Sequence, residues 1–240
     1  KAATINRKTM ALRGVLSWGV KQGLLETNAL SQMSRLQERD SETKVRYLSD
    51  YERRRLMDAL DDREEKIRAA RDRANEWRAI RELPLYPDLR RFAFVDHLKP
   101  AVLVSMNTGI RRGALFALEW RDVDFNEKTI TLKAENAKTG KHQIVPMNQV
   151  VMETLLKWRA QANEREKCVF EVTDCHKGWG QVLKKAGIEN FRWHDLRHDF
   201  ASRLVMAGVD LNTVRELLGH GDLKMTLRYA HLAPEKKRKA

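Results

Sequence analysis

The sequence has little cysteine and no long apolar run, and both absences restrict the class of protein. Only two of its 240 residues are cysteines, Cys168 and Cys175, and they do not stand with any histidine at a compact zinc-binding spacing. We therefore expect reduced thiols in a cytoplasmic protein rather than a disulfide framework. No apolar stretch reaches the ~18 residues of a membrane-spanning helix, and we expect neither a membrane segment nor a signal peptide.

Two common arrangements for phosphate chemistry are also missing from the sequence. It contains no glycine-rich loop of the form G-x-x-x-x-G-K-[ST], and no cluster of Asp and Glu typical of a two-metal nuclease. What the chain does have is positive charge, because 46 Lys and Arg outnumber 33 Asp and Glu for a formal net charge of +13. This excess favours a polyanionic partner, with nucleic acid ahead of a membrane surface. General solubility is the alternative explanation.

The hydrophobic content of 42% predicts a globular chain, long enough for one large domain or a domain plus a fragment. Residues 4–25 have the apolar spacing of an amphipathic helix, and the polar stretch 31–44 is typical of a linker. Ser49 and Glu52 form a capping-box pattern that predicts the start of a new helix. Its charged continuation, including residues 63–66, is expected to face water until Pro84 and Pro87.

The rest of the chain predicts a mainly α-helical α+β fold with a small antiparallel sheet. A helical pattern over 98–117 is interrupted at Asn107–Gly109, and strands are predicted at 129–134 and 142–147, joined as a hairpin by a turn at 138–141. A helix over 148–162 and a short strand over 168–172 follow. Further helices are predicted over 179–186, 194–207, 211–218 and 223–231, and the basic end, 235–240, is expected to be mobile.

Several chemically distinctive residues recur through this pattern: Arg111, Lys138, His194 with Arg197, His220 and Tyr229. His194 and Arg197 are three residues apart, so they share a face at the start of a helix. Each position alone has an ordinary explanation, since His220 could cap its helix and Tyr229 could pack against the core. Together they resemble an inventory for phosphoryl transfer without a metal.

The segment TGIRRGALFALEWRDVDF, the hairpin lysine, HDLRH, LLGH and a tyrosine nine residues later resemble the signature of tyrosine recombinases, the phage integrase family. The resemblance covers about Val45 to Leu232. It implies the tyrosine-recombinase catalytic fold over 45–240, and the opening segment, 1–44, resembles the last helix of the family's core-binding (arm) domain followed by a linker. It also implies a site-specific DNA recombinase that acts on double-stranded DNA as a homotetramer.

The resemblance further implies a role for each site residue. Tyr229 would attack a DNA phosphate and form a 3′-phosphotyrosyl link, with His194 as the base. A phenol needs such help because its ordinary pKa is about 10. Arg111 and Arg197 would hold the non-bridging oxygens with forked donors, and His220 would add another. Lys138 would protonate the leaving 5′-oxygen, and neither metal nor cofactor is required. His198 is expected to pack or to face solvent.

One position departs from the family pattern. The acidic residue usual three positions after the first arginine is replaced by Ala114, which removes the expected support of Arg111. Asp122 or Asp199 could supply it instead. The departure also keeps open a second reading, a non-catalytic DNA-binding module of the same fold. A type IB topoisomerase uses similar chemistry, but the spacing here is that of the recombinases.

Overall fold

The fold is described from a computed structural model, which covers residues 2–37, 45–133, 142–163, 166–171 and 175–234. The chain divides into two compact units, Lys1–Lys44 and Val45–Ala240. The first unit contains helix α1 (Ala2–Lys21), along which the following segment returns. The side chain of Asn6 exchanges hydrogen bonds of 2.9 Å with the backbone of Leu36 and fixes that return. Much of the apolar surface of α1 remains exposed, including Val15 and Trp18.

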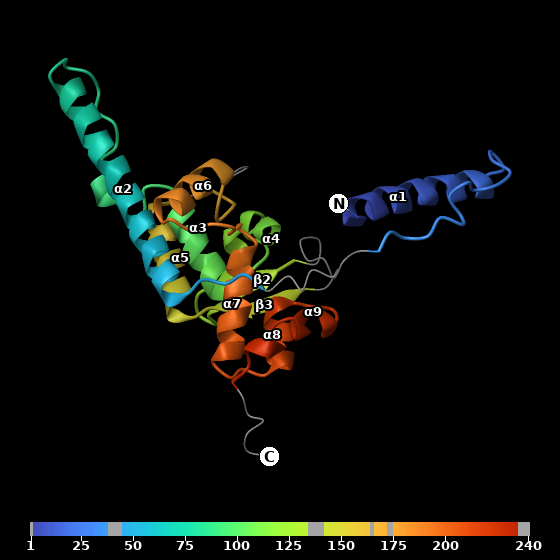
Figure 1. Ribbon diagram of the computed structural model, residues 1–240. Helices are drawn as coiled ribbons and strands as arrows, with labels where there is room; N and C mark the ends of the chain where they lie inside the picture. Colours follow the sequence, from blue (N-terminus) through green and yellow to red (C-terminus); the bar gives the residue numbers. More distant parts are fainter. Residues whose placement is uncertain (1, 38–44, 134–141, 164–165, 172–174, 235–240) are drawn as a thin grey trace. The chain divides into compact units, whose positions relative to one another are not determined.

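The second unit is mainly helical with a small antiparallel sheet, which confirms the predicted fold class. Figure 1 shows its long helix α2 extending beyond the other helices of the unit. Its α-helices are α2 (Asp50–Ala79), α3 (Leu98–Thr108), α4 (Arg112–Phe116), α5 (Gln149–Gln161), α6 (His176–Lys185), α7 (Asp195–Met206), α8 (Leu211–Leu218) and α9 (Lys224–Leu227). Short 3₁₀ turns are η1 (Leu89–Arg91), η2 (Trp120–Asp122) and η4 (Ala230–Leu232).

Helix α2 begins with the predicted capping box. The Ser49 hydroxyl accepts a hydrogen bond from the Glu52 amide at 3.1 Å, and the Glu52 carboxylate accepts one from the Ser49 amide at 2.9 Å. Arg46 pairs with the same carboxylate, and this hydrogen bond lowers the pKa of Glu52 to about 2. The start of α2 is therefore fixed by one reciprocal pair of caps and one ion pair.

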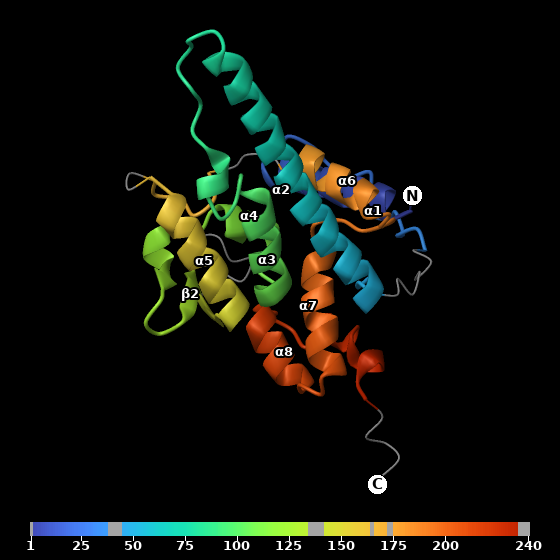
Figure 2. The same ribbon diagram turned by 90° about the vertical axis from the view of Figure 1, so that its left-hand side faces the viewer.

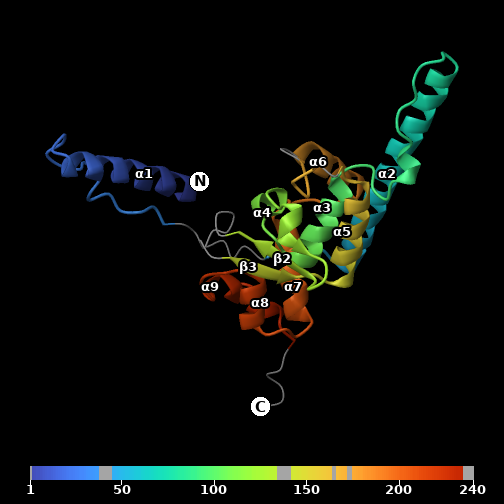
Figure 3. The ribbon, with the colours of Figure 1, turned by 180° about the vertical axis from the view of Figure 1, so that it is seen from behind.

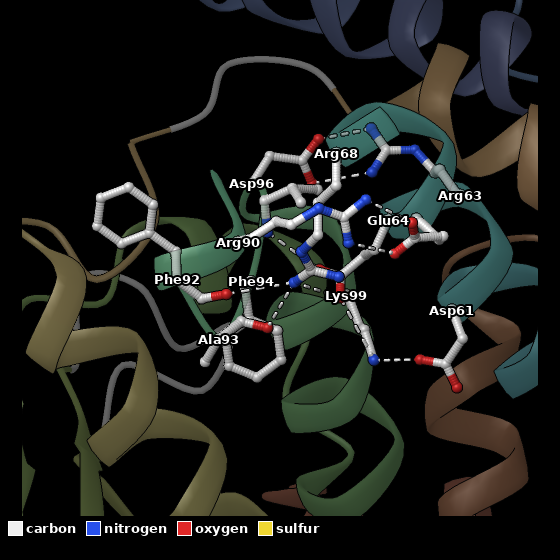
Figure 4. Close-up of polar contacts among 12 residues, drawn as sticks. Asp61, Arg63, Glu64, Arg68, Arg90, Phe92, Ala93, Phe94, Asp96 and Lys99 are labelled. Carbon is white, nitrogen blue, oxygen red and sulfur yellow. Dashed lines mark hydrogen bonds and ion pairs between the residues drawn. The ribbon is translucent and has the colours of Figure 1, made fainter. Parts of the chain in front are cut away.

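Residues 63–66 were expected mostly to face water, and Glu64 is an exception. Its side chain is buried against the segment that follows α2, where it accepts a hydrogen bond from the Val95 amide at 3.1 Å. Lys99 and Arg68 each approach the carboxylate at 3.5 Å, as Figure 4 shows. A buried carboxylate is stable only with such partners, and here they join α2 to the start of α3.

Helix α3 forms the centre of the unit, because it packs against both α5 and α7 (Figure 2). Its buried side chains include Leu98, Val102 and Met106. The helix ends where the sequence predicts, at Gly109, whose φ of 64° lies in the left-handed region that glycine favours. The chain then restarts as α4, so Arg111 stands between two helices.

The sheet has the order β1-β2-β3, from β1 (Val123–Asp124), β2 (Thr129–Leu132) and β3 (Gln143–Pro146). The predicted hairpin strands β2 and β3 pair antiparallel, with Ile130 opposite Val145, and lie near α8 and α9 in Figure 3. Strand β1 was not predicted from the sequence. Over residues 168–171, the described part of the strand predicted at 168–172, no strand forms, because only Cys168 makes a bridge, to Glu119. Val172 lies outside the described residues.

Three helices also differ from prediction. Helix α1 ends at Lys21 rather than at residue 25, helix α6 starts at His176 rather than at residue 179, and the helix predicted over 223–231 divides into α9 and η4. The division places Tyr229 in the short connection between them. Within the described ranges, no helix is long and apolar enough to cross a membrane.

Candidate active site

Most of the predicted site residues meet at one cavity of about 390 Å³ in the second unit. Those that line it are Arg111, His194, Arg197, His220 and Tyr229. They come from the start of α4, the start of α7, the residues after α8 and the connection after α9. Lys138, the remaining one, lies outside the described residues. The fold thus gathers distant parts of the sequence around a single space.

Arg197 links the C-terminal ends of two helices. Its side chain is buried, and it donates to the Gly109 carbonyl at the end of α3 at 2.8 Å and to the Leu218 carbonyl at the end of α8 at 2.5 Å. Carbonyls at helix ends lack intrahelical partners and carry partial negative charge, so they suit a buried cation. A guanidinium has more N–H donors than these two bonds use. The others are available to an anion in the cavity.

Two glycines make these helix ends possible. Gly109 and Gly219 both have positive φ, at 64° and 59°. A Cβ atom at Gly109 would lie 2.5 Å from Cδ1 of Phe200, and one at Gly219 would lie 2.2 Å from Oε1 of Gln143. A larger residue at either position would therefore strain the backbone and displace the neighbouring Phe200 or Gln143 side chain.

Arg111 is the N-cap residue of α4, and its side chain lines the same cavity. Over the described ranges, no hydrogen bond or ion pair holds its guanidinium. Burial lowers the pKa of Arg111, and burial followed by the charge of Arg111 lowers the pKa of Arg197 to about 9. Both remain cations at pH 7, and each would gain from an anion between them.

Neither aspartate proposed to support Arg111 contacts it, so that expectation is wrong. Asp199 is buried beneath α2, where it forms an ion pair of 2.9 Å with Arg53. Asp122 approaches Lys133 at 3.5 Å, beside the sheet. Neither Asp122 nor Asp199 therefore takes over the role of the carboxylate that the family usually has at the position of Ala114.

The His220 ring is fixed by Thr226, a residue on α9. His220 Nδ1 lies 2.8 Å from the Thr226 hydroxyl, which is fully buried. The ring therefore does not cap α8, whereas the His220 backbone amide does, by donating to the Arg215 carbonyl at 3.0 Å. Burial, and then the charge of Arg197, lowers the pKa of His220 to about 4, so the imidazole is neutral at pH 7.

Tyr229 combines packing with a polar contact. Its side chain is only 1% exposed and belongs to a small apolar cluster with residues of α7 and α8. Its hydroxyl lies 2.6 Å from Nδ1 of His198. His198 packs, as expected, against the rings of Tyr229 and His194, and its contact with the phenol is an addition that the sequence did not predict. The His194 ring stands edge-on to His198, with centroids 5.1 Å apart and an interplanar angle of 88°.

The cavity is strongly cationic. Lys224 and Arg228 of the α9 segment join the two arginines described above, and no carboxylate is among the described residues that line the cavity. Burial, and then the charge of Arg197, lowers the pKa of His194. Burial raises the pKa of Tyr229, and the charges of Arg197 and Arg228 oppose that rise. A site of this kind binds an anion such as a phosphodiester, and its cations favour the ionised form of the phenol.

Comparison with known proteins places this geometry in a family. The model of the phage integrase family matches residues 89–236, which is more than half of the chain. The chain belongs to the phage integrase family. Among its integrase relatives, that of Salmonella phage P22 is 35% identical over 158 residues, which are 58% of this chain and 40% of the relative. The tyrosine recombinase XerC of Pediococcus pentosaceus is 32% identical over 152 residues, or 55% of this chain and 49% of the relative.

Solved integrase-family structures share the fold. The catalytic domain of bacteriophage HP1 integrase superposes with a TM-score of 0.56 at 23% identity, covering 81% of this chain and 92% of that domain. XerH recombinase bound to a palindromic difH substrate gives a TM-score of 0.66 at 19% identity, over 99% of this chain and 65% of the recombinase. The chain spans about half or less of the length of the P22 and Pediococcus relatives.

Four cavity residues were not predicted from the sequence: His198, Lys224, Met225 and Arg228. Lys224 and Arg228 are four residues apart, which is a helical spacing that places them on one face. That spacing beside Tyr229 was the available signal. His198 gave no separate signal, because its contact depends on where the chain returns after α9.

Proposed function

We propose that this chain is the DNA-cleaving part of a site-specific recombinase, an integrase that cuts and rejoins double-stranded DNA through a 3′-phosphotyrosyl intermediate. The observation that carries the proposal is the buried phenol of Tyr229 in a cavity whose charged lining residues, among those that the structure describes, are all cations. A phosphodiester fits both features, because its negative charge suits the cationic cavity and its phosphorus can be attacked by a phenol. The names of the relatives, integrase and tyrosine recombinase, agree with it.

The arginines would stabilise the charge that gathers on the attacked phosphate. Arg197, held by two carbonyls, and Arg111, without a described partner, supply planar forks that match the two non-bridging oxygens. His220, oriented by Thr226, keeps its Nε2 side for a further hydrogen bond. Pre-oriented donors of this kind lower the barrier because they need no rearrangement during the reaction.

Proton transfer completes the proposed cycle. The phenol loses its proton to an imidazole as it attacks, for which the family resemblance offers His194, and Lys138 returns a proton to the leaving 5′-oxygen. The tyrosyl ester keeps the energy of the broken phosphodiester, so the reverse attack by a 5′-hydroxyl reseals the strand. The reaction therefore requires neither a metal nor a cofactor.

The proposal extends to assembly and domains. We propose that residues 1–44 are the end of a core-binding domain followed by a linker, which accounts for the exposed apolar surface of α1. The working enzyme would be a homotetramer on two duplexes in the cytoplasm of a bacterium, where its DNA substrate lies. Light scattering of the protein on DNA measures that stoichiometry directly.

The decisive test is covalent capture of DNA. The Tyr229→Phe variant first selects its preferred site from a random duplex library, and the selected sequence is then made with a nick beside each candidate phosphate. The wild-type chain should form a denaturant-resistant adduct on the nicked duplex, whereas Tyr229→Phe should form none and bind equally well. Tyr51→Phe, at an exposed tyrosine of α2, is the matched control and should behave as wild type.

Two results would contradict this function. A Tyr229→Phe variant that still forms the adduct removes Tyr229 from the role of nucleophile. A wild-type chain that binds the selected duplex and never forms an adduct supports the non-catalytic DNA-binding module instead. The missing carboxylate beside Arg111 is the observation that favours this second candidate.

A further inference from the structure

His198 is in direct contact with the proposed nucleophile. Its Nδ1 atom lies 2.6 Å from the Tyr229 hydroxyl, and the two rings are tilted at 48° with centroids 5.9 Å apart. Over the part of the chain that the structure describes, this is the only hydrogen bond of the Tyr229 hydroxyl. The phenol hydroxyl therefore already has an imidazole nitrogen within hydrogen-bond distance before any DNA is bound, and this nitrogen accepts the phenol proton when the ring carries its own proton on Nε2.

His194 is less well placed for the same task. No hydrogen bond joins its ring to Tyr229 among the described residues, and the ring lies against His198 instead. It stands at the N-cap of α7, whereas His198 is in the first turns of the helix, directly after Arg197. The residue that binds the phosphate and the residue that contacts the phenol are thus neighbours on one rigid helix.

We infer that His198, rather than His194, accepts the proton of Tyr229 during cleavage. The inference rests on the proposed function. The Oη–H bond of Tyr229 breaks and its proton moves to His198 Nδ1 while the Oη–P bond forms. The P–O5′ bond breaks, and the leaving oxygen takes a proton from the acid assigned above to Lys138. In the reverse attack, His198 returns the proton to Tyr229 and the lysine recovers its own.

The His198 ring is neutral before DNA binds and is therefore able to accept a proton. Burial, and then the charge of His194, lowers the pKa of His198 to about 4, so its ring is neutral at pH 7 and carries its proton on Nε2 when Nδ1 accepts. The same shift makes His198 a weak base in the free protein, and the anionic phosphate bound beside the ring would raise its proton affinity during attack. The charged or titratable groups around it are His194, Asp195 and Arg197 on α7, His220 after α8, and Arg228 and Tyr229 after α9.

The test compares two variants with different losses. His198→Phe removes the acceptor and keeps a ring, whereas His198→Asn keeps an acceptor oxygen near the position of Nδ1 without a basic nitrogen. Both should slow single-turnover cleavage of the selected nicked duplex by about 10²–10⁴-fold, the usual contribution of a general base, and leave duplex affinity unchanged. His97→Asn, at a partly buried histidine before α3, is the matched control and should cleave at the wild-type rate.

Two further readouts separate proton transfer from simple positioning. The wild-type rate should change little between pH 6 and 9, whereas the His198→Phe rate should rise about tenfold per pH unit as hydroxide replaces the missing base. A substrate with sulfur at the bridging 5′ position leaves without needing a proton. It should therefore not restore either variant relative to wild type.

The possible outcomes each decide the matter. Wild-type cleavage by His198→Phe, full activity of His198→Asn, a flat pH profile of the slow variant, or rescue by the 5′-sulfur substrate would each overturn the inference. Failure of the wild-type chain to form any adduct would instead overturn the proposed function. Duplex affinity equal to that of wild type shows that a slow variant is folded. If His198→Phe does not fold, His198→Asn still tests the inference.

Discussion

Arg197 offers the sharpest quantitative test, because it serves both the fold and the proposed chemistry. Lysine at this position keeps the charge but has one ammonium in place of a fork, so it cannot reproduce both carbonyl bonds and still offer two donors to a phosphate. A hydrogen bond from a charged group contributes about 1.5–3 kcal/mol, and we expect Arg197→Lys to lose about one such bond in free energy of unfolding. We also expect a loss of about 2.7–4 kcal/mol in transition-state stabilisation, as for an oxyanion donor, which is about 10²–10³ in rate.

Two measurements separate these effects. Urea unfolding of the free protein gives the change in stability, and single-turnover cleavage of the nicked duplex gives the change in rate. Arg203→Lys is the matched control on the same helix, because Arg203 also contacts a backbone carbonyl, that of Leu48, and an aspartate, Asp50, but does not line the cavity. It should lose some stability and keep the cleavage rate.

The reasoning fails if Arg197→Lys unfolds at the same urea concentration as wild type, since the two carbonyls would then not depend on the guanidinium. It fails differently if stability falls and cleavage is unchanged. That result would show that Arg197 has a purely structural role and that the phosphate binds to other residues.

Three more outcomes are expected. Thr226→Val removes the hydroxyl that orients His220 and should slow cleavage about tenfold or more with little effect on DNA binding; an unchanged rate would show that the His220 ring needs no such support. Glu52→Gln should destabilise the protein at pH 7 but not near pH 2, because the contribution of a carboxylate with a lowered pKa is present above pH 4.5 and lost as pH falls toward 2; Glu76→Gln, on the exposed face of α2, is the control in denaturation at both pH values. DNA affinity should fall with salt with a log–log slope of about −5 to −9 if roughly 6–10 phosphates are contacted, and a flat response would contradict a DNA-clamping surface.

Local signals predicted much of the fold. The capping box at Ser49 and Glu52 defined the start of α2, and the alternating, β-branched stretch at 129–132 defined β2. Gly109 and Gly219 marked the ends of α3 and α8, because glycine accepts the left-handed conformation there. These features depend on neighbours in the sequence and can be read without knowing the tertiary structure.

Features that depend on distant partners were not predicted. Glu64 lies in a charged run that looks solvated, yet the segment at Val95 returns to cover it. The strand expected over 168–172 had a suitable composition, but among its described residues, 168–171, only Cys168 forms a bridge to another segment. His198 contacts Tyr229 only because the chain turns between α9 and η4, which interrupted the helix predicted there.

The position of Arg197 also bears on how an inert version of this protein should be made. Replacing that arginine would abolish the proposed cleavage activity. It would also remove the two hydrogen bonds that join the C-terminal ends of α3 and α8. Removing a single oxygen from Tyr229 leaves the aromatic packing in place. For experiments that need a chain that binds DNA without cleaving it, Tyr229→Phe is the better variant, because it removes the proposed activity and keeps the folded structure.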